Sequence, residues 1–153
     1  MLLVVAGCGD SSSADDDGTE ISVETGSLSK AEFIKQADAI CEETVKNVQS
    51  EGEKYARKAE QASTPAVGLA AELPKFVRNV VVPMFEEEID QISSLGAPSG
   101  DEQEITVMLK ALQQGLVKAQ KEPQALFQGT NNKFNEATQL GEKYGFSSCG
   151  NIT

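Results

Sequence analysis

A long run of apolar residues spaced three and four apart constrains the fold of this chain more than any other feature. Apolar or small side chains recur at this spacing from Phe33 to Ala62, which corresponds to about eight helical turns. Ser29 and Glu32 stand at the N-cap and N3 positions of a capping box, and Ser63-Thr64-Pro65 marks an end. The pattern predicts one long amphipathic helix.

A second apolar pattern runs from about residue 66 to residue 95 and predicts another helix. Pro74 and Pro83 interrupt it. An interior proline removes a backbone donor and kinks a helix, so the pattern is compatible with one kinked helix or with two shorter ones. Gly96-Ala97-Pro98-Ser99-Gly100 then predicts a turn.

Two shorter helices are predicted in the last third of the chain. The first begins near Asp101, where Glu104 gives another capping-box spacing, and ends at Pro123. The second carries the apolar positions between Phe134 and Tyr144. Gly145 follows at the position where a left-handed C-cap glycine is expected.

The predicted fold class is all-α: an antiparallel bundle of about four helices with short loops. No segment shows the alternating pattern of a strand. Aromatic residues make up only 5% of the chain and Trp is absent, so the core should consist of aliphatic residues and Ala. We expect this bundle to occupy residues 28–153.

The first residues, "MLLVVAGCGD", permit two interpretations. A nucleotide-binding loop would need a helix directly after the glycines, but the following Ser and Asp residues have no apolar period and would repel phosphate. An export signal fits better, because Leu2 to Val5 are apolar, and Ala6 and Gly7 are small. No basic residue precedes Cys8, so we expect a natural start further upstream or a trimmed chain. A short apolar end with a free cysteine is the remaining alternative.

Val5-Ala6-Gly7-Cys8 resembles the lipobox of bacterial lipoproteins, in which the cysteine thiol receives diacylglycerol before the signal peptide is cleaved. The resemblance implies that residues 1–7 are the remnant of a signal peptide and that Cys8 is lipidated. It also implies attachment to the extracytoplasmic face of the bacterial cell membrane.

Residues 8–27 are predicted to form a flexible tether. The segment after Cys8 contains six acidic residues and no Lys or Arg, and most of the others are Ser, Gly and Thr. Such a composition buries too little apolar surface to offset the entropy of ordering. Asp15-Asp16-Asp17-Gly18 lacks the spacing and the closing Glu of an EF-hand loop, so a solvated spacer is favoured over a calcium site.

The chain has three cysteines. With a lipid on Cys8, Cys41 and Cys149 remain, and an even pair outside the cytosol implies a disulfide. A bond across a loop of roughly 100 residues contributes about 4.7 kcal/mol in the chain-entropy account. Two separate thiols, one of them buried, are the alternative.

Three stretches carry a family resemblance: "LSKAEFIKQADAIC", "IDQISSLGAPSGDEQ" and "EKYGFSSCG". They are similar to a group of small exported lipoproteins of actinomycete-type Gram-positive bacteria, over roughly residues 28–150. The resemblance implies a helical bundle, export and a cysteine pair. It implies no activity, because no activity is established for that group.

Composition excludes several classes of function. The chain has no His, which removes the commonest metal ligand and the commonest general base at neutral pH. The net charge of −11 disfavours binding to nucleic acid. No nucleophile motif is present, so we expect neither an enzyme nor a bound cofactor.

Glu86, Glu87 and Glu88, together with Asp90, form the densest acidic patch of the folded part. Glu86, Glu87 and Asp90 are weak candidates for binding a hard cation, and Glu86 and Asp90 share a helix face. A solvated helix face is the more usual explanation of such a patch.

We therefore expect a lipid-anchored binding or scaffold module. Its partners are the membrane, through the lipid on Cys8, and a protein at the cell envelope. One alternative is a carrier of a small apolar ligand held between the helices, lined by the Phe and Tyr residues, although core packing explains those residues more simply. An enzyme of unknown type is the least expected alternative.

Overall fold

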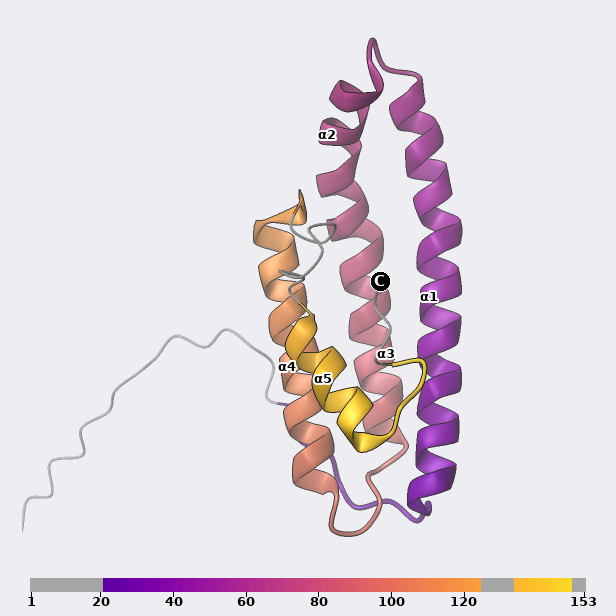
Figure 1. The fold of residues 1–153 in the computed structure, drawn as a ribbon, viewed down its shortest axis with the longest axis vertical. Helices are drawn as coiled ribbons and strands as arrows, with labels where there is room; N and C mark the ends of the chain where they lie inside the picture. Colours follow the sequence, from indigo (N-terminus) through magenta and orange to yellow (C-terminus); the bar gives the residue numbers. More distant parts are fainter. Residues whose placement is uncertain (1–20, 125–133, 150–153) are drawn as a thin grey trace, which may run out of the picture.

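A computed structural model describes residues 21–124 and 134–149 of the chain. Within these ranges the fold is all-α, as predicted, and an antiparallel helical bundle (Figure 1). Its elements are α1 (Lys30–Glu60), α2 (Pro65–Phe76), the π-helical segment η1 (Val77–Val81), α3 (Val82–Ser94), α4 (Glu102–Lys121) and α5 (Asn135–Tyr144). Cys8 and the predicted signal-peptide remnant lie outside the described residues.

Helix α1 begins with the predicted capping box. The Ser29 side chain accepts a hydrogen bond from the backbone N–H of Glu32 at 3.4 Å, and the Ser29 N–H donates to the Glu32 carboxylate at 3.1 Å. The distal halves of α1 and α2 extend beyond α4 as a two-helix hairpin (Figure 1). Gly68 permits their close approach, because a Cβ there would lie 2.0 Å from the carbonyl oxygen of Ala59.

The predicted second helix is one continuous rod made of α2, η1 and α3, and its centre is π-helical. The Val82 N–H donates to the Val77 carbonyl, five residues back, instead of four. Pro83 has no N–H for the Asn79 carbonyl, which lies inside η1. A wider π turn thus accommodates the missing donor without breaking the rod.

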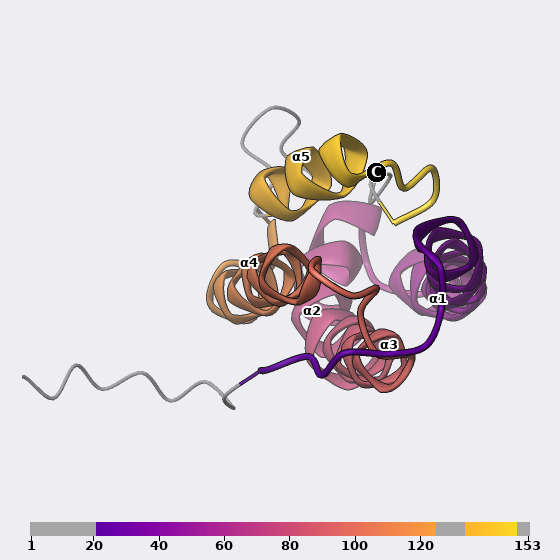
Figure 2. The same cartoon turned by 90° about the horizontal axis from the view of Figure 1, so that it is seen from below.

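The core lies between this rod, α1, α4 and α5. Its largest fully buried side chains come from α1, η1, α3, α4 and the residue before α5, and include Phe33, Val77, Ile92, Leu109 and Phe134. The apolar stripe predicted for α4 is buried as expected. Helix α5 covers one side of the three long rods (Figure 2). None of the helices in the described ranges is both long enough and apolar enough to cross a membrane.

The prediction that the tether continues to residue 27 is wrong for its last part. Residues 21–27 pack along the base of the bundle, on the opposite side from α5 (Figure 2). Ile21 and Val23 are buried, and the Ala97 N–H donates to the Glu24 carbonyl at 2.8 Å. Because these two apolar residues are two positions apart in an extended segment, both side chains face the bundle. Their burial provides the apolar contact that orders this otherwise polar segment. The described part of the domain therefore starts at residue 21, not at residue 28.

The capping box predicted at Asp101 does not form either. Asp101 is the N-cap residue of α4, but its side chain makes no capping bond. Its carboxylate instead accepts a hydrogen bond from the Tyr144 hydroxyl at 2.7 Å and lies 3.7 Å from the Lys30 ammonium. Gly145, which follows Tyr144, has a φ of +116° and ends α5 as predicted.

Candidate functional site

The predicted disulfide is present and joins the two ends of the described domain. Cys41 on α1 is bonded to Cys149, which follows α5, with a Cα–Cα distance of 5.1 Å. The Cys41 side chain is buried, and Cys149 is half-buried. The bond fixes the segment after α5 onto the first helix.

Asp38, one turn before Cys41 on α1, also binds this segment. Its carboxylate accepts hydrogen bonds from the backbone N–H groups of Ser147, Ser148 and Cys149, at 3.0, 2.8 and 3.2 Å, and from the Ser147 hydroxyl at 2.7 Å. Burial raises the pKa of Asp38, but these hydrogen bonds outweigh it, so the pKa is lowered.

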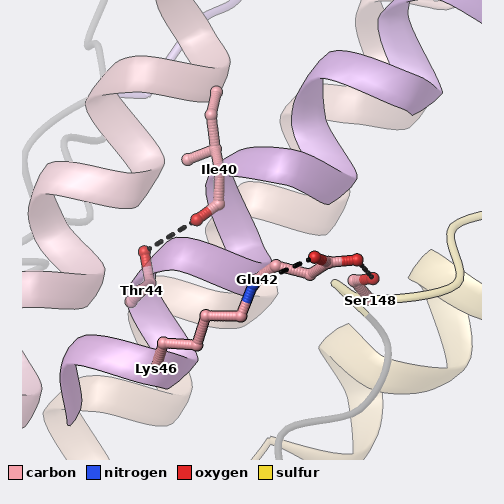
Figure 3. Close-up of polar contacts among 5 residues, drawn as sticks. All are labelled: Ile40, Glu42, Thr44, Lys46 and Ser148. Atoms are coloured by element: carbon pink, nitrogen blue, oxygen red, sulfur yellow. Dashed lines mark hydrogen bonds and ion pairs between the residues drawn. The ribbon is translucent and has the colours of Figure 1, made fainter. Parts of the chain in front are cut away.

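Glu42 continues this contact along α1. Its carboxylate accepts a hydrogen bond from the Ser148 hydroxyl at 3.1 Å and pairs with Lys46 at 3.4 Å (Figure 3). Glu42 and Lys46 are exposed, so this ion pair contributes little to stability. Asp38 and the disulfide therefore contribute more than this ion pair to the attachment of residues 147–149.

Glu88 on α3 is the buried charged residue of the described domain, with 3% of its surface exposed. Burial raises its pKa to about 7, and a hydrogen bond with the Thr44 side chain lowers it only partly. Its Oε2 atom has no hydrogen-bond partner among the described residues. The Thr44 hydroxyl donates to the Ile40 carbonyl at 3.2 Å (Figure 3).

Two cavities meet at Glu88. The first has a volume of about 10 Å³ and lies beneath the disulfide; its lining residues are Glu88, Ile92, Met108, Leu109, Leu112, Ala137 and Cys149. The second is a polar pocket of about 80 Å³ between α1 and α3, hereafter the α1–α3 pocket; its lining residues are Ile40, Glu43, Thr44, Asn47, Met84, Glu87, Glu88 and Gln91.

The apolar cavity bears on the idea of an apolar-ligand carrier. A volume of about 10 Å³ accommodates at most about one water molecule, so this cavity cannot hold an apolar ligand. The aromatic residues pack against one another instead, as Phe85 and Phe134 do with ring centroids 6.0 Å apart. These contacts agree with core packing.

The predicted acidic candidates Glu86, Glu87 and Asp90 are all exposed. Glu87 lines the α1–α3 pocket, whereas Asp90 lines an open groove beside residues 22–27. Among the residues that the structure describes, no group of three or more His, Cys, Asp or Glu side chains is arranged to hold a metal ion.

Sequence reasoning missed the special position of Glu88, which it treated as part of the exposed patch. A signal was present, because Glu88 lies three residues after Phe85 and four before Ile92, both of them core positions. A carboxylate in phase with the apolar stripe of a helix points into the core.

Comparisons with known proteins identify no relative: no family model matches the chain, and no curated protein and no solved structure is significantly similar to it.

Proposed function

We propose that this protein is a lipid-anchored binding or scaffold module on the extracytoplasmic face of the bacterial cell membrane. The disulfide between Cys41 and Cys149 carries the proposal. Disulfides form and persist in oxidising compartments and are rare in the cytosol. Pairing these two cysteines leaves Cys8, in the lipobox-like Val5-Ala6-Gly7-Cys8, as the one remaining cysteine.

The docking of residues 21–27 on the bundle supports a short connection to the membrane. A lipid on Cys8 would be joined to the domain through residues 9–20, which span at most about 40 Å when fully extended. The lipid contributes about 0.8 kcal/mol per buried CH₂, so a diacylglycerol with two chains attaches the protein durably. The domain would then act close to the membrane surface.

The test is metabolic labelling with an alkyne-tagged fatty acid in the native cell. We expect label in the membrane fraction for the natural protein and for the neighbouring control Ser12→Ala. Cys8→Ser should lose the label and leave the membrane fraction, because it removes the acceptor thiol. A protein that keeps Met1, carries no label and fractionates in the cytosol would refute the anchor.

The binding part of the proposal has its own test, which is crosslinking in the native membrane followed by identification of the partner. We expect a specific envelope protein to be recovered with the natural protein and lost with Cys8→Ser, since the anchor supplies the local concentration. Equal recovery with Cys8→Ser would show that partner binding does not depend on the anchor.

A further inference from the structure

The exposed side of α4 carries a set of lysines, hereafter the α4 lysine face: Lys110, Lys118 and Lys121. We propose that this face binds the acidic run of residues 15–20 of the same chain. The inference deepens the proposed function, because the contact would set how far the domain lies from its membrane anchor. That consequence rests on the proposed lipid at Cys8. The contact itself does not, so the two can fail separately.

The α4 lysine face has positive charge without local compensation. Residues 105–121 contain its three lysines and neither Asp nor Glu, although the chain as a whole has a net charge of −11. The nearest acidic residues in the sequence are Glu104 and Glu122, which flank this stretch. Lys110 and Lys121 are about three full turns apart and therefore point to the same side of the helix.

The lysines of this face differ from other basic residues of the bundle. Several basic side chains of α1 and α2 pair with an acidic residue of the same helix or of α4, namely Lys30, Lys46, Lys54, Arg57 and Lys75. The α4 lysines have no such partner among the residues that the structure describes. Lys118 and Lys121 lie in the last turn, where they complement the helix dipole, but Lys110 lies in the middle of the helix. The face is thus open to an anionic segment.

The N-terminal segment runs beside this face. The Val23 N–H donates to the Thr106 hydroxyl at 3.2 Å, and the Thr25 hydroxyl donates to the Glu102 carboxylate. Two residues of the segment thus correspond to four residues of α4, as the rises of about 3.3 Å in an extended chain and about 1.5 Å in a helix require. Figure 2 shows the N-terminal end of this segment, at the buried Ile21, on the α4 side of the bundle.

A continuation of the same course would bring the acidic run level with the lysines. At two residues for every four of α4, Asp17 falls level with Lys118. Glu20 falls level with about residue 112, within a side chain's length of Lys110. The acidic run lies outside the described residues, so this register is the expectation that the experiment tests.

The contact should be weak pair by pair and sensitive to salt. An exposed ion pair contributes little by itself. Several pairs form together here, and the covalent connection gives the acidic run a high effective concentration at the face. The Debye length falls from about 10 Å at 0.1 M salt to about 3 Å at 1 M, so the contact should form at the lower concentration and be released at the higher one.

The contact would shorten the reach of the anchor. With the acidic run bound to α4, only residues 9–14 would join a lipid on Cys8 to the bundle. These residues span at most about 20 Å, against about 40 Å for residues 9–20. The ionic strength at the membrane surface would then decide how far the domain can move from the bilayer.

The experiment uses the full 153-residue chain, unlipidated and with its disulfide formed, so that Cys8 is the one free thiol. A nitroxide spin label attached to Cys8 broadens the NMR signals of amides that lie near it. At 0.1 M salt we expect broadening in the last two turns of α4, which include Lys118 and Lys121. Transfer to 1 M salt should reduce this broadening at least threefold, because the charges are screened.

Neutralising the acidic run tests its side of the contact. The combined change Asp15→Asn, Asp16→Asn and Asp17→Asn should reduce the broadening of the α4 signals at least threefold at 0.1 M salt. It changes no residue of the described domain, so a failure to fold is not expected to obscure the result.

Neutralising the lysines tests the other side. Lys118→Gln combined with Lys121→Gln should reduce the broadening to the same extent. The matched control is Lys46→Gln combined with Lys54→Gln, which makes the same change of net charge on α1 and should leave the broadening unchanged. All four lysines are exposed, so the fold should be retained.

Several outcomes would overturn the inference. The first is equal broadening at both salt concentrations or in the variant with the neutral run. Broadening between a spin-labelled chain and a separate isotope-labelled chain would assign the face to a second copy. Shifts of the Lys118 and Lys121 signals by vesicles of anionic phospholipid, without any response to the neutral run, would assign it to the membrane.

Discussion

The Asp38 carboxylate lies 3.2 Å from the backbone nitrogen of Cys149. Asp38 is one helical turn before Cys41, the residue to which Cys149 is disulfide-bonded. Residues 147–149 are thus held to α1 by two kinds of attachment: hydrogen bonds to the Asp38 and Glu42 carboxylates, and a covalent bond. The two attachments act on the same short segment, so their effects on stability should be coupled.

Replacing Asp38 tests the carboxylate. Asp38→Asn should lower the free energy of unfolding by about 1–2 kcal/mol, because it weakens several charge-assisted hydrogen bonds at a partly exposed site. Glu42→Gln, which affects one side-chain bond to Ser148, should change it by less than about 0.5 kcal/mol. Urea unfolding at pH 7 measures both, and equal effects of the two variants would contradict the special role of Asp38.

Removing the disulfide should have a larger effect. Cys149→Ser should lower the free energy of unfolding by about 2–5 kcal/mol, because the unfolded chain is no longer closed into a long loop. Cys8→Ser, measured on the unlipidated chain, serves as the matched control and should leave the unfolding midpoint unchanged. A midpoint that is unaffected by Cys149→Ser would show that the bond does not restrict the unfolded chain.

Glu88 should make the domain less stable as pH rises. The unfolded chain loses the Glu88 proton near the ordinary pKa of 4.5, whereas the folded domain keeps it to about pH 7. Between these values the unfolded state binds fewer protons, so the free energy of unfolding falls with pH, by up to about 3 kcal/mol in total.

Comparison of two variants isolates this contribution. Glu88→Gln should remove the fall in stability between pH 4.5 and pH 7, and Glu87→Gln should retain it, since Glu87 is exposed on the same helix. Denaturant midpoints measured at several pH values give the result. A pH dependence that persists in Glu88→Gln would assign the fall to other groups.

The hairpin of α1 and α2 should depend on Gly68. Gly68→Ala should cost about 1–3 kcal/mol, because the new methyl group would meet the backbone of Ala59 at 2.0 Å and the helices would have to move apart. Gly52→Ala should cost less, because its neighbour is the edge of the Phe76 ring at 3.3 Å and Ala is the better helix former. Thermal unfolding of the two variants distinguishes them, and an equal loss would show that the contact at Gly68 is not limiting.

The features predicted correctly from the sequence are those set by short-range rules. The capping box at Ser29, the apolar period of α1 and the left-handed Gly145 each depend on residues within a turn or two. The disulfide was predicted from the cysteine count and from the compartment implied by the lipobox, not from geometry. The sequence left open whether Pro74 and Pro83 kink one helix or divide it into two, because local rules allow a proline to break a helix or only to disturb it, and it did not predict the π-helical segment.

The features that the sequence did not predict all depend on contacts between distant segments. Asp101 has the right spacing for a capping box, yet its carboxylate binds the Tyr144 hydroxyl, 43 residues away. Ile21 and Val23 lie in a segment whose composition indicates a tether, yet they are buried in the core formed by the helices.

Glu88 shows the same division at the candidate site. The chain alone places it in an acidic run beside Glu86 and Glu87, and local charge favours solvent exposure of all three. Its burial and its pKa of about 7 arise because α1 and α4 pack over that one face of α3. Helix formation is decided by neighbours along the chain, whereas desolvation of a side chain is decided by whichever elements the fold brings against it.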